Sequence, residues 1–314
     1  MPGLSPKELA RKADEVMTYA GLSAAGQLND KQLTQFRAIM IAESRLWGDC
    51  EVVLLDQKKM KYEYAGFTGP ILFPVAEESA FPAELEKGLS MIKIPFDCQK
   101  FGAAVPITDE VLRNNLNQNT LVSFMMSQAL PQIALNTEDY AINSDKTGGA
   151  TYYDAIDGLL SRPTSHVLTP GTAQAVGPRL WDDMLISMPS KYRRDKPNMR
   201  FYCSPNTEQA YIYERQSKTA APGYDYAEQD KGFRTSYSGI PIFPLEGIPD
   251  GYSILTHRKN IVGAFEKKAE AEPKRQAEYP RTMYYFWCWF DVNYAVEDAV
   301  VLHTNIEITV APTV

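Results

Sequence analysis

The sequence predicts an α+β fold, and three patterns lead to that prediction. Residues 101–107 are typical of a strand and run into residues 108–145, which carry no charged side chain between Arg113 and Glu138. Residues 284–290 are aromatic except for one cysteine, a run that is apolar on both faces, as in a central strand covered on both sides. A connection rich in proline and aromatic residues, 66–88, separates two further strand-like stretches. We therefore expect a central sheet, a long helix on one of its faces, and a projecting hairpin.

Composition and charge restrict the class of molecule. The chain has 314 residues, of which 44% are hydrophobic, so it can bury a sizeable core in one elaborate domain or two. Its net charge of −7 argues against binding of nucleic acid through bulk electrostatics, although residues 191–196 form a local basic patch. Residues 1–5 lack the pattern of a secretory signal, so we expect synthesis in a cytoplasm. The four cysteines are far apart, which favours buried free thiols over a zinc site or a disulfide framework.

The first 48 residues are predicted to form an arm with two helices. A capping box with proline at the first helical position begins the first helix at residues 5–8. A second helix is expected from about residue 29, with Phe36 and Trp47 on one face and Gly48 at its end. Because the segment between them is small and loop-like, this arm needs another surface to lie on.

Residues 51–64 and 91–106 are predicted strands that flank the long connection. Connections of this length without regular structure are usually functional or disordered. We interpret this one as a projecting hairpin with a charged tip at residues 84–87. Its Phe73 and Phe81 would be exposed to solvent in a monomer, which implies a partner.

The uncharged helix is predicted to begin at Thr108, a good N-cap residue, with Asp109 and Glu110 where the helix dipole favours negative charge. Apolar residues then recur at helical spacing. Seven Asn and Gln side chains between residues 114 and 132 exclude a membrane-spanning helix. A helix that is neither charged nor strongly apolar is best explained by packing against other protein, so this segment indicates assembly.

Strands, helices and loops alternate in the second half of the chain. A helix is expected over 181–194, with acidic residues at its start and basic residues at its end, as the dipole favours. A strand at 200–203 leads into a helix over 204–217, and further strands are expected near 234–243, 253–256 and 261–267. The charged segment 266–281 is interpreted as a solvated loop or an edge hairpin.

Chemical motifs are absent from the sequence. There is no nucleophile elbow, phosphate-binding loop, dinucleotide fingerprint or zinc-protease motif. His166, His257 and His303 lie in different regions without neighbouring ligands at metal-binding spacing. Lys58 and Lys61 could bind phosphate or lipid, but lysines that protect a solvated strand edge are the better interpretation. No catalytic, cofactor-binding or metal site is predicted, and we do not expect an enzyme.

The order of these elements resembles the major capsid protein of tailed bacteriophages, which has the Hong Kong ninety-seven type coat fold. Residues 105–112 resemble the entry into the spine helix of that family, and residues 156–160 resemble the Gly-Leu segment that follows it. Residues 188–193 and 201–207 resemble the helix, strand and Asn-Thr turn of its axial domain, and residues 237–242 its Gly-Ile-Pro-Val strand. The resemblance extends over essentially the whole chain.

The resemblance implies a division of the chain and a set of contact residues. The parts would be an N-terminal arm (1–50), an extended loop with its flanking strands (51–107), the spine helix (108–145), an axial domain (146–262) and return strands of the peripheral domain (263–314). The loop would lie over a neighbouring subunit and the arm would reach under another. The implied inter-subunit contact residues are Phe36, Trp47, Lys58, Lys61, Phe73, Phe81, Glu84 and Glu86.

The implied function is structural. Pentamers and hexamers of the chain would form an icosahedral shell, the capsid of a virion, around double-stranded DNA that is not bound sequence-specifically. Separate scaffold and portal proteins would be its partners, with cement proteins as further candidates, and neither a cofactor nor a membrane is implied. Two alternatives remain open: an encapsulin-type nanocompartment shell that encloses an enzyme, and a soluble α+β enzyme, since fold alone does not fix function.

Overall fold

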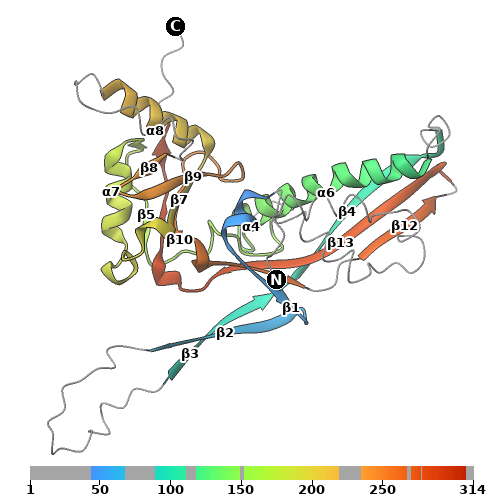
Figure 1. Ribbon diagram of the computed structural model, residues 1–314, viewed down its shortest axis with the longest axis horizontal. Coiled ribbons are helices and arrows are strands. Elements are labelled where there is room, and N and C mark those ends of the chain that lie inside the picture. Colours follow the sequence, from blue (N-terminus) through green and yellow to red (C-terminus); the bar gives the residue numbers. More distant parts are fainter. Residues whose placement is uncertain are drawn as a thin grey trace, which may run out of the picture.

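The computed structural model has two lobes and a hairpin that projects from the junction between them (Figure 1). We name them the spine lobe, built on the long strand β13 (Arg281–Tyr294) and the long helix α6 (Gln118–Asn143), and the six-strand lobe, built on a six-stranded sheet. The structure describes residues 44–67, 89–110, 118–148, 152–218, 235–266, 270–276 and 278–308.

Strand β13 organises the spine lobe. Along one edge it pairs antiparallel with β4 (Gln99–Thr108), and along the other with β12 (Glu270–Gln276) and then β11 (Ile261–Glu266). Strand β1 (Glu51–Leu55) adds to β11 in parallel. Helix α6 runs along β4 and β13 (Figure 1), and its residues share one hydrophobic core with the sheet. The predicted central aromatic strand is confirmed, and the segment predicted as a loop or edge hairpin contains the edge strand β12.

Among the residues that the structure describes, one face of β13 is fully covered and the other is not. Side chains at alternate positions, Tyr284, Phe286, Cys288 and Phe290, are buried on the side of α6. On the other face Tyr285, Trp287 and Trp289 are only half-buried, and the first two rings stack with centroids 6.0 Å apart. Within the described residues the expectation that both faces are covered is thus met in full on one face and only in part on the other.

The six-strand lobe has the strand order β5-β14-β10-β7-β9-β8. Helices α7 (Pro178–Ser187) and α8 (Pro205–Lys218) pack with this sheet in a second core that includes Trp181, Phe201 and Tyr211. A two-stranded pair, β6 with β15, lies beside it. The strand bounds are Val167–Leu168 (β5), Gln174–Ala175 (β6), Met199–Cys203 (β7), Ser236–Tyr237 (β8), Ile240–Pro244 (β9), Ser253–His257 (β10), Val300–His303 (β14) and Ile306–Glu307 (β15). Short 3-10 turns are Ser190–Tyr192 (η2), Lys196–Asn198 (η3), Arg258–Asn260 (η5) and Glu297–Ala299 (η6).

Strand β14 corrects the predicted division of the chain. It was assigned with residues 263–314 to the return strands of the peripheral domain, but it lies between β5 and β10 in the six-stranded sheet. The chain leaves β13, makes the turn η6, and crosses into the other lobe. Strand pairing between segments so distant in sequence leaves no local signal by which the boundary could be placed.

Helix α7 corrects a second expectation. It begins at Pro178, three residues earlier than predicted, and ends at Ser187, seven residues earlier than predicted. Met188 is already extended, with ψ of 133°. Pro189 follows it, and a proline disfavours helical geometry in the residue before it. The basic residues 191–194 therefore lie outside α7, and the predicted interaction with its dipole is absent.

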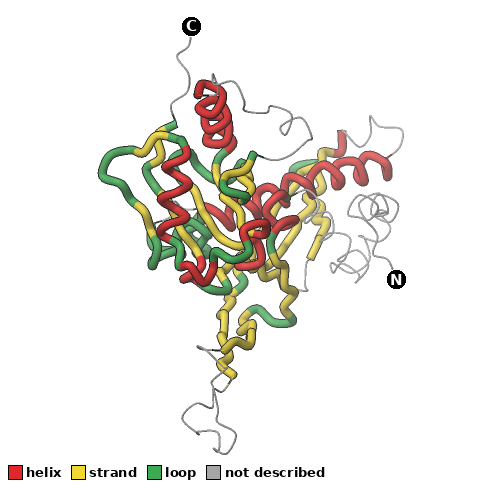
Figure 2. Tube along the Cα trace, turned by 60° about the vertical axis from the view of Figure 1, so that its left-hand side comes forward, coloured by secondary structure: helices red, strands yellow, loops and turns green. Residues whose placement is uncertain are grey.

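The projecting hairpin is formed by β2 (Lys59–Phe67) and β3 (Leu89–Asp97), which pair along their whole length. Its base is held by a small third core, in which Ile94 and Phe96 of β3 pack against Leu55 and Val262 of the spine lobe. The two views in Figures 1 and 2 both show β2 and β3 leading away from the lobes. The prediction of a projecting hairpin is confirmed, whereas residues 68–88 lie outside the described residues.

Candidate assembly interface

A short helix, α4 (Arg45–Asp49), ties the end of the predicted arm to the spine lobe. Its N-cap residue Ser44 accepts a hydrogen bond from the backbone N–H of Trp47 (3.1 Å). The Ser44 hydroxyl also donates to Glu138 Oε2 of α6 (2.6 Å), and the same oxygen accepts from the backbone N–H of Leu46 (3.2 Å). The buried Glu138 carboxylate of α6 thus accepts hydrogen bonds at the N-terminus of α4 and helps to cap it.

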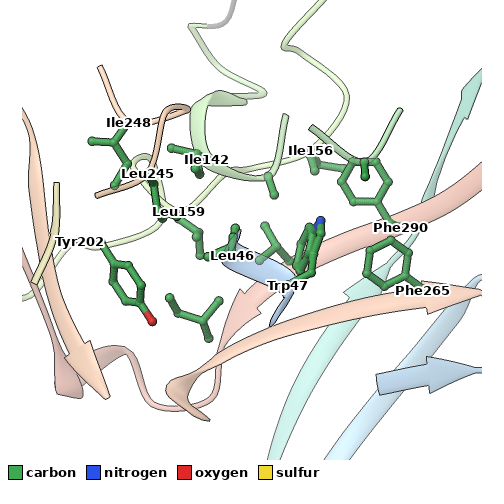
Figure 3. Packing of buried hydrophobic residues seen from close by; sticks show 14 of the residues in the cluster. Leu46, Trp47, Ile142, Ile156, Leu159, Tyr202, Leu245, Ile248, Phe265 and Phe290 are labelled. Carbon is green, nitrogen blue, oxygen red and sulfur yellow. The ribbon is translucent and has the colours of Figure 1, made fainter. Parts of the chain in front are cut away.

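Trp47 belongs to the core of its own chain. Its side chain is 1% exposed and lies beside Phe265 and Phe290, with the Phe265 ring 5.1 Å away in an edge-on arrangement (Figure 3). Its indole Nε1 donates to Thr137 Oγ1 of α6 (3.2 Å). A Cβ atom at Gly263 would lie 2.3 Å from the indole ring, so glycine is what allows the ring to lie on β11. The prediction that Trp47 contacts a neighbouring subunit is therefore wrong, because its surface is already buried against β11, β13 and α6.

The other end of α4 is held by the six-strand lobe. Asp49 Oδ2 accepts a hydrogen bond from the Tyr202 hydroxyl (3.0 Å) and lies 3.3 Å from Arg200 Nε, both on β7. Arg258 Nη1 lies 3.9 Å from the other carboxylate oxygen. Burial, followed by the charge of Asp49, raises the pKa of the Tyr202 hydroxyl, so it remains a donor. Five residues of helix thus join the spine lobe to β7 of the six-strand lobe, and Tyr202 belongs to the same hydrophobic core as Trp47.

The base of the hairpin presents a charged surface. Lys58 and Lys61 are exposed and have no ion pair within the described part of the chain. Their neighbours Lys59 and Lys93 instead pair with carboxylates of the hairpin itself, Asp97 (3.1 Å) and Glu63 (2.9 Å). The remaining predicted contact residues, Phe36, Phe73, Phe81, Glu84 and Glu86, lie outside the described residues.

A groove opens where the hairpin base meets the two lobes, and we name it the junction groove. It has a volume of about 500 Å³ and is lined by Tyr62 and Ile94 of the hairpin, Tyr192 and Arg194 after α7, Lys259 of η5, and Val296 before η6, among others. The Tyr62 hydroxyl donates to Glu51 Oε1 across it (3.4 Å), and the Glu51 charge raises the pKa of that hydroxyl. The sequence indicated a basic patch at 191–196, but not this groove, because its floor comes from segments that are distant in the sequence.

Two carboxylates that are adjacent in the sequence, Glu297 and Asp298, bind segments of the chain beside this groove. Glu297 accepts hydrogen bonds from the backbone N–H groups of Thr164 (2.7 Å) and Ser165 (2.8 Å). Asp298 instead pairs with Lys191 Nζ (2.9 Å), and hydrogen bonds from Lys191 and from the imidazole of a nearby histidine lower the pKa of its carboxyl. The two side chains diverge toward separate partners, as expected from their adjacency, and fix loops instead of forming an acid/base pair.

Within the described ranges, no group of three or more His, Cys, Asp and Glu side chains is arranged to hold a metal ion. No described helix is long and apolar enough to cross a membrane. All four cysteines are free thiols, three of them buried.

Comparisons with known proteins agree with this architecture. No family model matches the sequence. The "Putative prophage capsid protein YqbE" of Bacillus subtilis (strain 168) is 25% identical over 309 residues, which cover 94% of this chain and 96% of the relative. Among solved structures, a chain of the satellite phage P4 procapsid has a TM-score of 0.69 at 12% identity and covers 92% of this chain and 95% of its own. The SrpI encapsulin of Synechococcus elongatus PCC 7942 has a TM-score of 0.58 at 13% identity, covering 86% and 91% of the two chains.

The solved structures define the class of this chain by its fold, which is the Hong Kong ninety-seven type coat fold. Within that class, the sequence similarity over nearly the whole chain is to a prophage capsid protein, whereas the similarity to an encapsulin is one of fold.

Proposed function

We propose that the protein is the major capsid protein of a tailed phage or prophage, and that pentamers and hexamers of it form an icosahedral shell around double-stranded DNA. The full-length similarity to a prophage capsid protein, on a chain with the coat fold, is the observation that carries this proposal. The half-buried aromatic face of β13 and the hairpin that leaves the lobes support it, because both present surface that a second copy would cover.

The contacts of the shell are proposed to come from the hairpin and the arm. Lys58 and Lys61 would meet a neighbour at the hairpin base, where they have no ion pair within the described residues. Phe73, Phe81, Glu84 and Glu86 would do so at its tip, and Phe36 in the arm. Contacts between different surfaces of identical copies are heterologous, and they close into rings when the rotation between copies is a whole fraction of a turn.

The proposed partners follow from the same assignment. A net charge of −7 suits a wall that encloses DNA without binding it tightly. A separate scaffold protein, a portal protein and cement proteins would complete the particle. Synthesis would take place in the cytoplasm of the bacterial host, with the virion as the final location.

Expression of the chain, alone and with the product of a neighbouring scaffold gene, tests this function. We expect particles that elute in the void volume of a size-exclusion column and show icosahedral outlines in electron micrographs. A stable 35.3 kDa monomer under both conditions would overturn the proposal.

An encapsulin-type nanocompartment is the second candidate, and the structural match to SrpI encapsulin is the observation that favours it. The contents of particles purified from the native host separate the two functions. Nuclease-protected double-stranded DNA supports the capsid, whereas a packaged enzyme without DNA supports the nanocompartment.

A further inference from the structure

We propose that two prolines protect the open edges of the spine-lobe sheet from strand addition, so that copies of this chain do not join edge to edge through it. They are Pro106 of β4 and Pro273 of β12, the strands that flank β13 (Figure 1). Within the described residues, neither flanking strand pairs with a further strand on its outer side. The backbone groups that point outward from β4 and β12 therefore lie at two open edges.

The direction of the backbone groups of β4 follows from one hydrogen bond. The N–H of Asp109 donates to the carbonyl of Pro280 (2.9 Å), across the pair that β4 forms with β13. In an antiparallel pair, consecutive residues direct their N–H and C=O groups to alternate sides. Pro106 is three residues before Asp109, so its nitrogen points away from β13, to the outer edge.

The same alternation fixes the direction of the backbone of β12. Pro280 directs its carbonyl to β4, and Tyr284, four residues later, directs its N–H and C=O groups to the same side. Pro273 lies opposite Tyr284 on the other side of β13, so its nitrogen does not face β13 and points to the outer edge. Both prolines thus stand where a missing N–H leaves the pairing with β13 intact.

Each proline interrupts a row of outward hydrogen-bond donors. On β12 the remaining outward N–H groups belong to Ala271 and Arg275, on either side of Pro273. On β4 the row is interrupted between Ala104 and Thr108. A strand that added to either edge at this level would lose a hydrogen bond of the new ladder, which disfavours its addition.

Charged side chains give β12 a second form of protection. Four of its seven residues are charged, namely Glu270, Glu272, Lys274 and Arg275. The last three are exposed, and Arg275 pairs with Asp109 (2.7 Å). A short strand that combines charge with an outward proline is one of the ways in which sheets avoid edge-to-edge pairing.

The strand between the two edges explains why protection matters here. From Met283 to Phe290, β13 has no charged residue, and six of its eight residues are aromatic. Uncharged segments of high β-propensity are the ones that stack into aggregates when an edge is open. In the proposed function many copies meet before they assemble, so an open edge beside this strand would compete with the contacts of the shell.

Replacement of Pro273 by threonine tests the protection, because it restores an outward N–H without adding apolar surface. We expect Pro273→Thr to form aggregates that bind thioflavin T at a concentration about tenfold or more below that of the wild type. Pro106→Thr repeats the test independently on the other edge. Unchanged urea unfolding of the dispersed variants would exclude loss of folding as the cause.

Lys274→Thr is the matched control. It introduces the same side chain at the next position of β12, where the N–H already points to β13, and the charge that it removes can only favour association. We expect its aggregation threshold to stay within about twofold of the wild type. An equal fall for Lys274→Thr and Pro273→Thr, or no fall for either proline variant, would overturn the proposal.

Hydrogen exchange shows whether association takes place through the edge. In the associated form of Pro273→Thr, the outward amides at positions 271, 273 and 275 should be protected, whereas in the dispersed protein they should exchange rapidly. Association that leaves these amides unprotected would assign it to another surface and would also overturn the proposal. None of these readouts requires a shell, so they remain decisive even if the proposed function is wrong.

Discussion

Replacement of Trp47 by alanine should lower the free energy of unfolding by about 4 kcal/mol, within the range of about 3–5 kcal/mol for a buried aromatic residue. The structure indicates a value near the middle of this range. The indole is 1% exposed and packs edge-on against the rings of Phe265 (5.1 Å) and Phe290 (6.4 Å), and edge-on aromatic pairs add about 0.5–1.5 kcal/mol to simple burial. The lost hydrogen bond to Thr137 adds little, because the Thr137 hydroxyl keeps its own acceptor, the carbonyl of Ala134 (2.8 Å).

Trp47→Phe is the matched control for this substitution. It keeps an aromatic ring on Gly263 and loses the indole N–H and part of the ring volume. We expect a loss of about 1–2 kcal/mol, so the difference between the two variants isolates aromatic packing.

Urea unfolding followed by far-ultraviolet circular dichroism measures both effects without relying on tryptophan fluorescence. The protein should be kept unassembled at low concentration, because contacts between subunits stabilise the folded state by mass action. A loss below about 1 kcal/mol for Trp47→Ala would refute the assignment of α4 to the core of its own chain, and would return Trp47 to the inter-subunit contacts that the sequence first suggested.

Two further predictions concern the spine lobe. Gly102→Ala would place a Cβ atom 2.3 Å from the Trp287 ring on the neighbouring strand, so the ring must move, and urea unfolding should show a free energy of unfolding lower by about 1–3 kcal/mol. Gly171→Ala is the control and should be nearly neutral, because no atom lies within 4 Å of the added Cβ. Equal effects of the two substitutions would contradict this reasoning. Burial raises the pKa of the Cys98 and Cys288 thiols to about 12, so they stay protonated in the folded protein, whereas unfolded thiols ionise near pH 8.5. The free energy of unfolding should therefore fall as the pH rises above about 8.5, and a thiol reagent should modify the native protein far more slowly than the urea-unfolded chain; equal rates would show that these thiols are accessible.

The elements that sequence reasoning predicted well are those with a strong local signal. The aromatic run within β13 and the long uncharged helix α6 stand out because composition alone separates them from their surroundings. The hairpin was found from the length and proline content of its connection. Helix α7 was misplaced because acidic and basic residues at the two ends of a segment were given more weight than Pro189, which ends the helix before the basic residues begin.

The candidate interface shows where sequence reasoning fails. Trp47 was assigned to the inter-subunit contacts of an arm, because nothing in the sequence shows that Gly263, more than two hundred residues later, leaves space for its ring. The junction groove was missed for the same reason: the basic residues near Arg194 are visible in the sequence, but the apolar floor at Ile94 and Val296 exists only after three distant segments meet. Pairing between distant segments is a property of the tertiary fold, which periodicity and composition do not encode locally.

Strand β14 has a consequence for how the protein is made. It lies between β5 and β10, so the six-stranded sheet remains divided until residues 300–303 have left the ribosome. Chains are synthesised from the N-terminus, and the parts of the six-strand lobe that are made earlier must wait with an open sheet edge at β10. A chain that stops before residue 300 therefore lacks a complete lobe and keeps β10 as an unpaired strand edge, to which another chain could add.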